Sequence, residues 1–130
     1  MASARHALTR ETLGQFEQLI LTAIKTIGRD AYGVPIYEKV CELSDKRINF
    51  GSLYVTLDRL EKKRLVSSRY SDPKKEPRGK SKRFYQLRAD GDRLLQESVA
   101  TSLRVADALS GEWGFIKKWK PTPPQKLRRA

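Results

Sequence analysis

The sequence predicts a mainly α-helical protein with one small β-hairpin, an α+β fold. Two features of the 130 residues point to this class. Apolar residues recur at steps of three and four in four segments, which is the spacing of one helix face. Two further short segments lie between the third and the fourth of these helical segments, and they alternate in residue type, as strands do. The length suits one compact domain with tails.

The composition excludes several classes of protein. The single cysteine cannot form an internal disulfide, and one cysteine with one histidine cannot supply the four ligands of a structural zinc site. The sequence has no run of about 18 apolar residues and no secretory signal. It also lacks a Ser-His-Asp pattern and a glycine-rich phosphate loop. We therefore expect a cytoplasmic protein that is not an enzyme and uses no cofactor or metal.

The first two expected helices cover residues 13–27 and about 34–44. The apolar stripe of the first consists of Leu13, Phe16, Leu19, Ile20, Ala23, Ile24 and Ile27. Gly28 follows it as a stop, and Pro35 suits the first turn of the next helix. The inward residues of this second helix are expected to be Ile36, Tyr37, Val40 and Leu43, with Cys41 as a small buried residue rather than a reactive thiol.

The third expected helix lies within residues 48–65 and begins at Asn49, a good N-cap residue. Leu53, Leu57 and Leu60 form its apolar stripe. Helical geometry then places Ser52, Val55, Arg59 and Lys62 on the opposite side, with Thr56 and Lys63 flanking them. Tyr54 lies near the edge of the stripe. Its hydroxyl either points toward a phosphate or is the exposed tip of a core tyrosine.

Two strands follow, over residues 66–70 and 82–87. The intervening SDPKKEPRGKS contains two prolines and a glycine, which argues against a helix and predicts a long, mobile hairpin tip. A fourth helix is expected from about Asp90 to Leu109. Its apolar stripe consists of Leu94, Leu95, Val99, Leu103, Ala106 and Leu109, which pack either within the chain or against a second copy.

The positive charge is concentrated rather than spread. The net charge is +12, and residues 59–83 hold eleven basic and three acidic side chains. Residues 13–58 and 84–111 are each close to neutral. A concentrated excess of this kind indicates an anionic partner, whereas lysines and arginines that merely solvate a surface are interspersed with acidic residues.

The order of elements is that of a winged helix-turn-helix, in which the third helix enters the major groove of DNA and the hairpin contacts the flanking backbone. A resemblance to a known family rests on four segments and on Gly91, which follows them. The segments are LGQFEQLILTAI at 13–24, AYGVPIYEKV at 31–40, FGSLYVTLDRLEKKRLV at 50–66 and PRGKSKRFYQL at 77–87. The chain resembles PadR-type transcriptional regulators, in the small form with a single C-terminal helix. That resemblance implies a homodimer held by the last helix, and a repressor that binds a pseudo-palindromic operator.

Four regions are expected on this basis. Residues 1–12 form a flexible arm, 13–87 the DNA-binding domain, 88–111 the dimerisation helix, and 112–130 a basic tail rich in aromatic residues and proline. Arg88 stands where such sequences carry a capping Thr or Ser, so the last helix is expected to start at Asp90. Trp113, Phe115 and Trp119 either seal the end of the dimer or contact a ligand or nucleic acid.

The expected DNA contacts fall into two groups. Arg59 is the first choice for reading guanine, with Ser52, Val55 and Thr56 at neighbouring base edges. The expected phosphate contacts are Lys62, Lys63, Arg69, Lys74, Lys75, Arg78, Lys80, Lys82 and Arg83, with Tyr54 as a further candidate. The expected dimer interface is the apolar stripe of the last helix.

The expected partners are double-stranded DNA and a second copy of the chain, with no membrane partner, so the protein is expected at the bacterial nucleoid. A small-molecule effector is compatible with the resemblance but no residue identifies it; a site near Phe16, between the first and fourth helices, is the candidate. Two alternatives stay open, nonspecific nucleic-acid binding and action through a protein partner.

Overall fold

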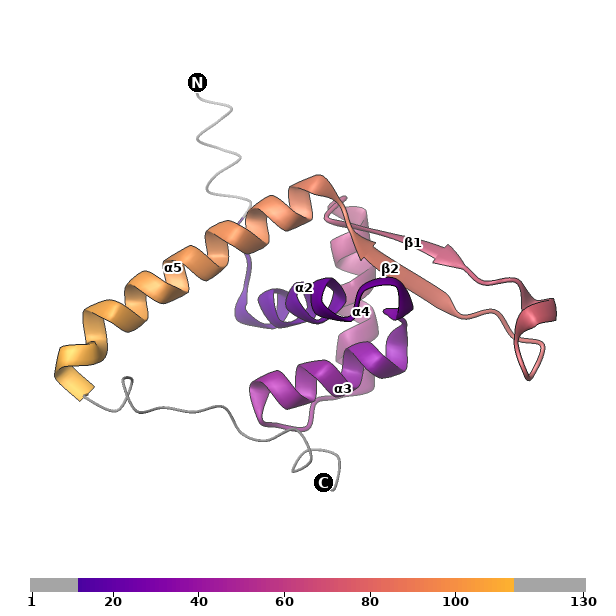
Figure 1. The fold of residues 1–130 in the computed structure, drawn as a ribbon, viewed down its shortest axis with the longest axis horizontal. Helices are drawn as coiled ribbons and strands as arrows, with labels where there is room; N and C mark the ends of the chain where they lie inside the picture. Colours follow the sequence, from indigo (N-terminus) through magenta and orange to yellow (C-terminus); the bar gives the residue numbers. More distant parts are fainter. Residues whose placement is uncertain (1–11, 114–130) are drawn as a thin grey trace.

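The computed structural model describes residues 12–113 of the chain. Its elements are α2 (Gln15–Ile27), the short 3₁₀ helix η1 (Gly28–Asp30), α3 (Gly33–Ser44), α4 (Phe50–Lys62), β1 (Val66–Tyr70), the short 3₁₀ helix η2 (Pro73–Lys75), β2 (Arg83–Leu87) and α5 (Ala89–Trp113). The expected mainly helical fold with one hairpin is confirmed. Helices α2, α3 and α4 pack together, the hairpin projects to one side of them, and α5 extends to the other side (Figure 1).

Helix α2 forms the centre of the core. Its residues Ile20, Leu21, Ala23 and Ile24 are buried. The Glu17 carboxylate accepts a hydrogen bond from the Gly14 backbone N–H at 3.0 Å and so completes the first turn. Gly28 ends the helix at a φ of 83°, a conformation that favours glycine. The expected stripe faces the core, but it omitted Leu21, which is fully buried, and the helix begins two residues later than the first apolar residue of the stripe.

Helix α3 buries Ile36, Val40 and Cys41, as expected. The prediction was wrong for Leu43, which is 45% exposed. Leu43 lies in the last turn of α3, and the chain leaves the helix two residues later through Asp45, at a φ of 59°. The stripe reaches the core only in the earlier turns.

Helix α4 begins as the sequence predicts. The Asn49 side chain accepts a hydrogen bond from the Ser52 backbone N–H at 3.0 Å, which satisfies one of the free donors of the first turn. Leu53, Leu57 and Leu60 are fully buried against the rest of the core.

The hairpin pairs β1 with β2 in antiparallel register, from Val66 opposite Leu87 to Tyr70 opposite Arg83. It is tied to the helices because the Tyr85 N–H donates to the Ala31 carbonyl at 2.8 Å. The expectation of a tip without any helix was wrong, since residues 73–75 form one 3₁₀ turn. Pro73 is tolerated there because the first position of such a turn needs no N–H donor, and the Asp72 carboxylate caps it by accepting from the Lys74 N–H.

Helix α5 starts one residue earlier and ends later than predicted, and it includes Trp113, which the sequence placed in the tail. Phe115 and Trp119 lie outside the described residues. The Arg88 N–H donates to the Leu65 carbonyl at 2.9 Å, which fixes the point where the hairpin passes into the helix. The early turns of α5 pack on α2, and its later turns extend away from the core (Figure 1). None of the helices within residues 12–113 is long and apolar enough to span a membrane.

Candidate nucleic-acid interface

The exposed face of α4 carries most of the side chains that the sequence assigned to it. Ser52, Arg59 and Lys62 are exposed, and Val55 is 56% exposed. Thr56 is the exception and corrects the expectation, because it is only 6% exposed and lies on the same side as the leucine stripe. These four exposed residues offer one small polar group, one apolar group and two cations.

Sequence reasoning missed two acidic residues on α4. Asp58 is exposed, and Glu61 in the next turn is half-buried. Both pair with Arg83 of β2: Arg83 Nη2 donates to Glu61 Oε1, and Nη1 lies 3.5 Å from Asp58 Oδ1. An acidic pair three residues apart on a basic helix was the available signal, but its partner lies in another element.

Three further basic residues expected to contact phosphate have partners within the chain. Lys63 Nζ lies 3.0 Å from Glu17 Oε2. Lys82 Nζ lies 3.5 Å from Glu76 Oε1. The Arg69 guanidinium donates to the Arg29 carbonyl at 3.3 Å and lies 4.7 Å from the centre of the Phe84 ring. These contacts compete with any phosphate contact by the same groups.

Six of the basic side chains that the sequence assigned to DNA stand apart from such contacts. They are exposed and form no ion pair or side-chain hydrogen bond with any residue in the range 12–113. They are Arg59, Lys62, Lys74, Lys75, Arg78 and Lys80. The first two belong to α4 and the other four to the hairpin tip. The basic side chains of this set that have no partner among residues 12–113 therefore lie on two elements.

An aromatic stack borders the start of α4. The Tyr37 and Phe50 ring centroids are 4.0 Å apart and nearly parallel, and Phe50 and Tyr54 are 6.0 Å apart. Tyr54 is 44% exposed, while its hydroxyl lies where a β-carbon at Gly33 would be. The ring therefore packs within the fold on one side and meets solvent on the other.

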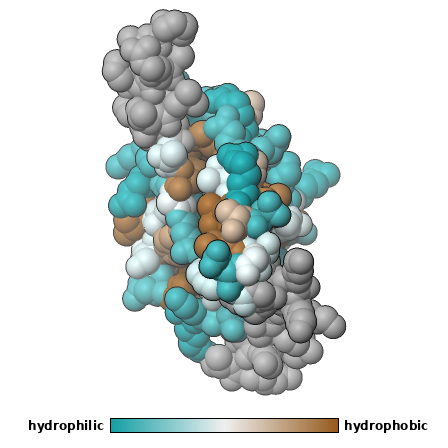
Figure 2. Space-filling model, turned by 90° about the vertical axis from the view of Figure 1, so that its left-hand side faces the viewer, coloured by the Kyte–Doolittle hydropathy of each residue, from teal (hydrophilic) through white to brown (hydrophobic). Residues whose placement is uncertain are grey.

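The apolar stripe of α5 divides into two parts. Leu94 and Leu95 are 6% and 7% exposed and belong to the core of the chain itself. Val99 and Leu103 are 37% and 65% exposed, while Ala106 and Leu109 are half-buried. Trp113 adds a large ring that is 58% exposed. Apolar side chains interrupt the hydrophilic surface on the side of the molecule toward which α5 extends (Figure 2).

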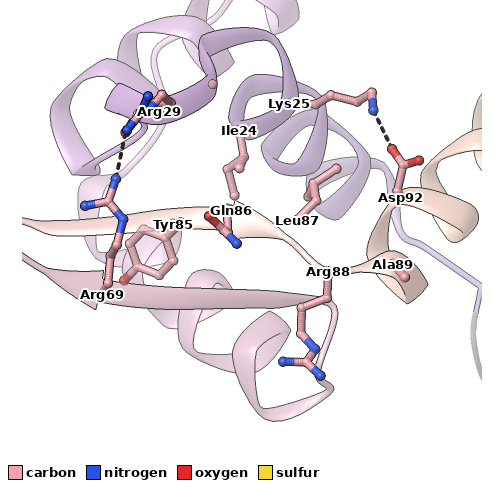
Figure 3. A pocket seen from close by; sticks show the side chains of 11 residues that line it. Ile24, Lys25, Arg29, Arg69, Tyr85, Gln86, Leu87, Arg88, Ala89 and Asp92 are labelled. Atoms are coloured by element: carbon pink, nitrogen blue, oxygen red, sulfur yellow. Dashed lines mark hydrogen bonds and ion pairs between the residues drawn. The ribbon is translucent and has the colours of Figure 1, made fainter.

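A cleft of about 550 Å³ lies between the end of α2, the hairpin and the start of α5. Figure 3 shows Arg69 reaching the backbone of Arg29 at one end and Lys25 pairing with Asp92 at the other. The Lys25–Asp92 ion pair is 2.6 Å long. Hydrogen bonds from Lys25 and from Gln96 lower the pKa of Asp92 below its ordinary value. This pair fastens α5 to α2.

A second cleft of about 560 Å³ lies between α2 and α5. Across it the Ser98 hydroxyl donates to the Gln18 side-chain oxygen at 2.7 Å. Within residues 12–113, no group of His, Cys, Asp and Glu side chains is arranged to hold a metal ion.

The core, the antiparallel hairpin and the capped third helix define a winged helix-turn-helix protein. The sequence model of the Transcriptional regulator PadR-like family matches residues 20–97, and the chain belongs to this family. Members of the family are transcriptional regulators that bind DNA, rather than enzymes.

Solved structures have the same fold. A PadR family transcription regulator from hypervirulent Clostridium difficile R20291 superposes with a TM-score of 0.60 at 23% identity, over 75% of this chain and 97% of that one. A PadR family transcriptional regulator from Eggerthella lenta DSM 2243 gives a TM-score of 0.58 at 25% identity, over 85% of this chain and 88% of that one. No curated protein matches the chain.

Proposed function

We propose that the protein is a homodimeric repressor that binds a pseudo-palindromic operator, with α4 in the major groove and the hairpin on the flanking backbone. One observation carries this proposal. The six assigned basic side chains that have no partner among residues 12–113 lie on the exposed face of α4 and on the hairpin tip, the two elements that a winged helix presents to DNA.

Base reading is assigned to the exposed side of α4. Arg59 is the candidate for a paired contact with guanine, worth about 1–3 kcal/mol of discrimination. Ser52 and Val55 stand nearer the N-terminal end of the helix, the part that usually contacts base edges, and Val55 fits a thymine methyl group. Thr56 is left out because its side chain is buried.

Backbone contacts are assigned to Lys62 and to the hairpin tip. Lys74, Lys75, Arg78 and Lys80 are exposed on the hairpin tip between β1 and β2, which suits groups that follow a phosphate chain. Such contacts release counterions, so they set the affinity and its salt dependence rather than the sequence preference.

The dimer is assigned to the uncovered part of α5. Val99, Leu103 and Trp113 leave apolar surface exposed beyond the turns that pack on α2. Pairing two copies there doubles the site, since one short helix reads too few base pairs for useful selectivity. A small-molecule effector would act through the cleft between α2 and α5, because a shift of α5 changes the spacing of the two α4 helices.

The backbone assignment is tested by salt dependence. Binding to duplex DNA from upstream of the protein's own gene is measured by fluorescence anisotropy over a series of salt concentrations. Replacing Lys74, Lys75, Arg78 and Lys80 together with Ala is expected to reduce the slope of log affinity against log salt. The reduction should be about 0.9 for each phosphate that the variant no longer neutralises.

A variant that removes Lys39 and Arg93, which lie on α3 and α5, is the control and should keep the wild-type slope. An unchanged slope in the four-residue variant would remove the hairpin from the interface. Absence of binding by the wild type to this duplex and to a scrambled one would favour a protein partner instead.

A further inference from the structure

Arg83 sits at the junction of three elements. It is the first residue of β2, and its Nη2 donates to Glu61 at the end of α4. Its Nε donates to the Ser68 hydroxyl of β1 at 3.1 Å, and that hydroxyl donates to Glu61 Oε2 at 2.8 Å. The hydrogen bonds therefore close a ring that contains α4 and both strands.

We infer that Arg83 is a positioning residue that fixes the hairpin relative to α4, so that backbone contacts and base contacts form together. The inference rests on the proposed function for its consequence on DNA binding. Its structural part concerns the free protein and stands on the contacts of Arg83 alone.

The surroundings of Arg83 favour a fixed geometry. The side chains of Arg83 and Glu61 are 34% and 32% exposed, so water screens their attraction less than at an open surface. The guanidinium carbon lies 5.2 Å from the centre of the Tyr85 ring and 5.7 Å from that of Tyr70. A guanidinium offers donors in a rigid planar fork, whereas a lysine offers a single flexible charge.

The same contacts limit the use of Arg83 as a phosphate ligand. Its positive charge faces two carboxylates, Glu61 and Asp58, of which Asp58 is 58% exposed beside the basic face of α4. Without Arg83 these carboxylates would repel nearby phosphates and each other. Arg83 therefore stabilises the acidic edge of α4 and adds no free charge to the interface.

A phosphate contact and a positioning role differ in their response to lysine. Arg83→Lys keeps the charge, so a phosphate contact would survive it in large part. A positioning role requires the planar fork of the guanidinium, so Arg83→Lys should loosen the hairpin and weaken DNA binding as Arg83→Gln does. Glu61→Gln should have the same effects, although the negative charge of Glu61 cannot attract DNA.

The first measurement is hydrogen exchange in the free protein. Arg83→Lys is expected to speed exchange of the amides in β1 and β2 and to leave those of α2 and α3 unchanged, with Glu61→Gln giving the same pattern. Arg93→Lys, at an exposed ion pair on α5, is the control and should match the wild type. Unchanged exchange of the hairpin amides in both Arg83→Lys and Glu61→Gln would overturn the inference.

The second measurement uses two duplexes that share a core sequence, selected by the wild type from a random-sequence library. One duplex is long enough to reach the hairpin and the other ends at the core. Arg83→Lys is expected to lose about five- to tenfold in affinity for the long duplex, little for the short one, and nothing more when combined with Glu61→Gln.

The inference would be overturned if Arg83→Lys bound the long duplex with the affinity of the wild type while Arg83→Gln had a salt slope reduced by about 0.9. Arg83 would then be a phosphate contact. Failure of the wild type to select or bind any duplex, together with faster hairpin exchange in Arg83→Lys, would contradict the proposed function and still support the coupling of the hairpin to α4.

Discussion

Gly91, in the first turns of α5, lies directly against the backbone of Leu65. A β-carbon at position 91 would stand 2.1 Å from the Leu65 carbonyl oxygen, too close for any unstrained contact. The same carbonyl accepts the hydrogen bond of the Arg88 N–H. Leu65 lies between α4 and β1, so this contact sets how closely the start of α5 approaches the junction of α4 with the hairpin.

Gly91→Ala is therefore expected to destabilise the fold by about 1–3 kcal/mol, because backbone atoms must move to admit the methyl group. Gly111→Ala, in the same helix but with nothing within 4 Å of its β-carbon, is the matched control. It should stabilise the helix by up to about 1 kcal/mol. Urea unfolding at neutral pH compares the two, and equal effects would contradict the assigned contact.

The Lys25–Asp92 pair predicts a pH-dependent stability. Because Lys25 lowers the folded pKa of Asp92 below its ordinary 3.8, the pair stabilises the fold above that value and the stabilisation is lost as pH falls through the folded pKa. Asp92→Asn should unfold at lower urea than the wild type at neutral pH, and this gap should close in acid.

Asp107→Asn, on the same helix, is the control for this prediction, since the Asp107 carboxylate forms no ion pair within residues 12–113. A gap for Asp92→Asn that stays constant down to acid pH would mean that the Lys25 contact does not depend on the carboxylate charge.

Tyr85 predicts the opposite trend in alkali. Burial raises its pKa from 10.0 to about 12, because a phenolate would be poorly solvated at this buried position of β2. The unfolded chain then releases this proton first, so stability falls as pH rises between these two values. Tyr85→Phe should show a shallower fall in its urea midpoint over that window. Parallel curves for the two proteins would contradict the burial of the hydroxyl.

The dimer assignment predicts a selective effect at Leu103, which is 65% exposed. Leu103→Glu should leave the thermal midpoint of the isolated chain nearly unchanged but convert a dimer to a monomer at micromolar concentration, because it places charge in an apolar contact. Leu43→Glu, at an exposed leucine on α3, should stay dimeric. Sedimentation velocity distinguishes the two, and a monomeric wild type would contradict the assignment.

Local patterns in the sequence predicted the elements well. The Asn49 cap and the leucine stripe of α4 appear as expected, because capping and periodicity depend on residues three or four positions apart. The same patterns could not show what covers a stripe. Leu95 and Leu103 belong to one stripe of α5, yet Leu95 is buried in the core and Leu103 is exposed.

The candidate site was predicted less completely. Arg83 and Lys63 were assigned to phosphate because each lies in a basic run, but their partners Glu61 and Glu17 are 22 and 46 residues away in the chain. Only the packed fold brings those charges together. Thr56 was misplaced for a different reason. It stands three residues after Leu53 and four before Leu60, a spacing that puts it on the buried side of α4, but its polar side chain was read as exposed.

Arg59 provides the most direct test of base reading by α4. The measurement is the ratio of affinities for the duplex from upstream of the protein's own gene and for a scrambled duplex of equal length, in the wild type, Arg59→Ala and the control Arg93→Ala. We expect a high ratio in the wild type and in Arg93→Ala. Arg59→Ala should lose about 1–3 kcal/mol of this discrimination, with nonspecific binding little changed. Retention of the full ratio in Arg59→Ala would contradict base reading by α4.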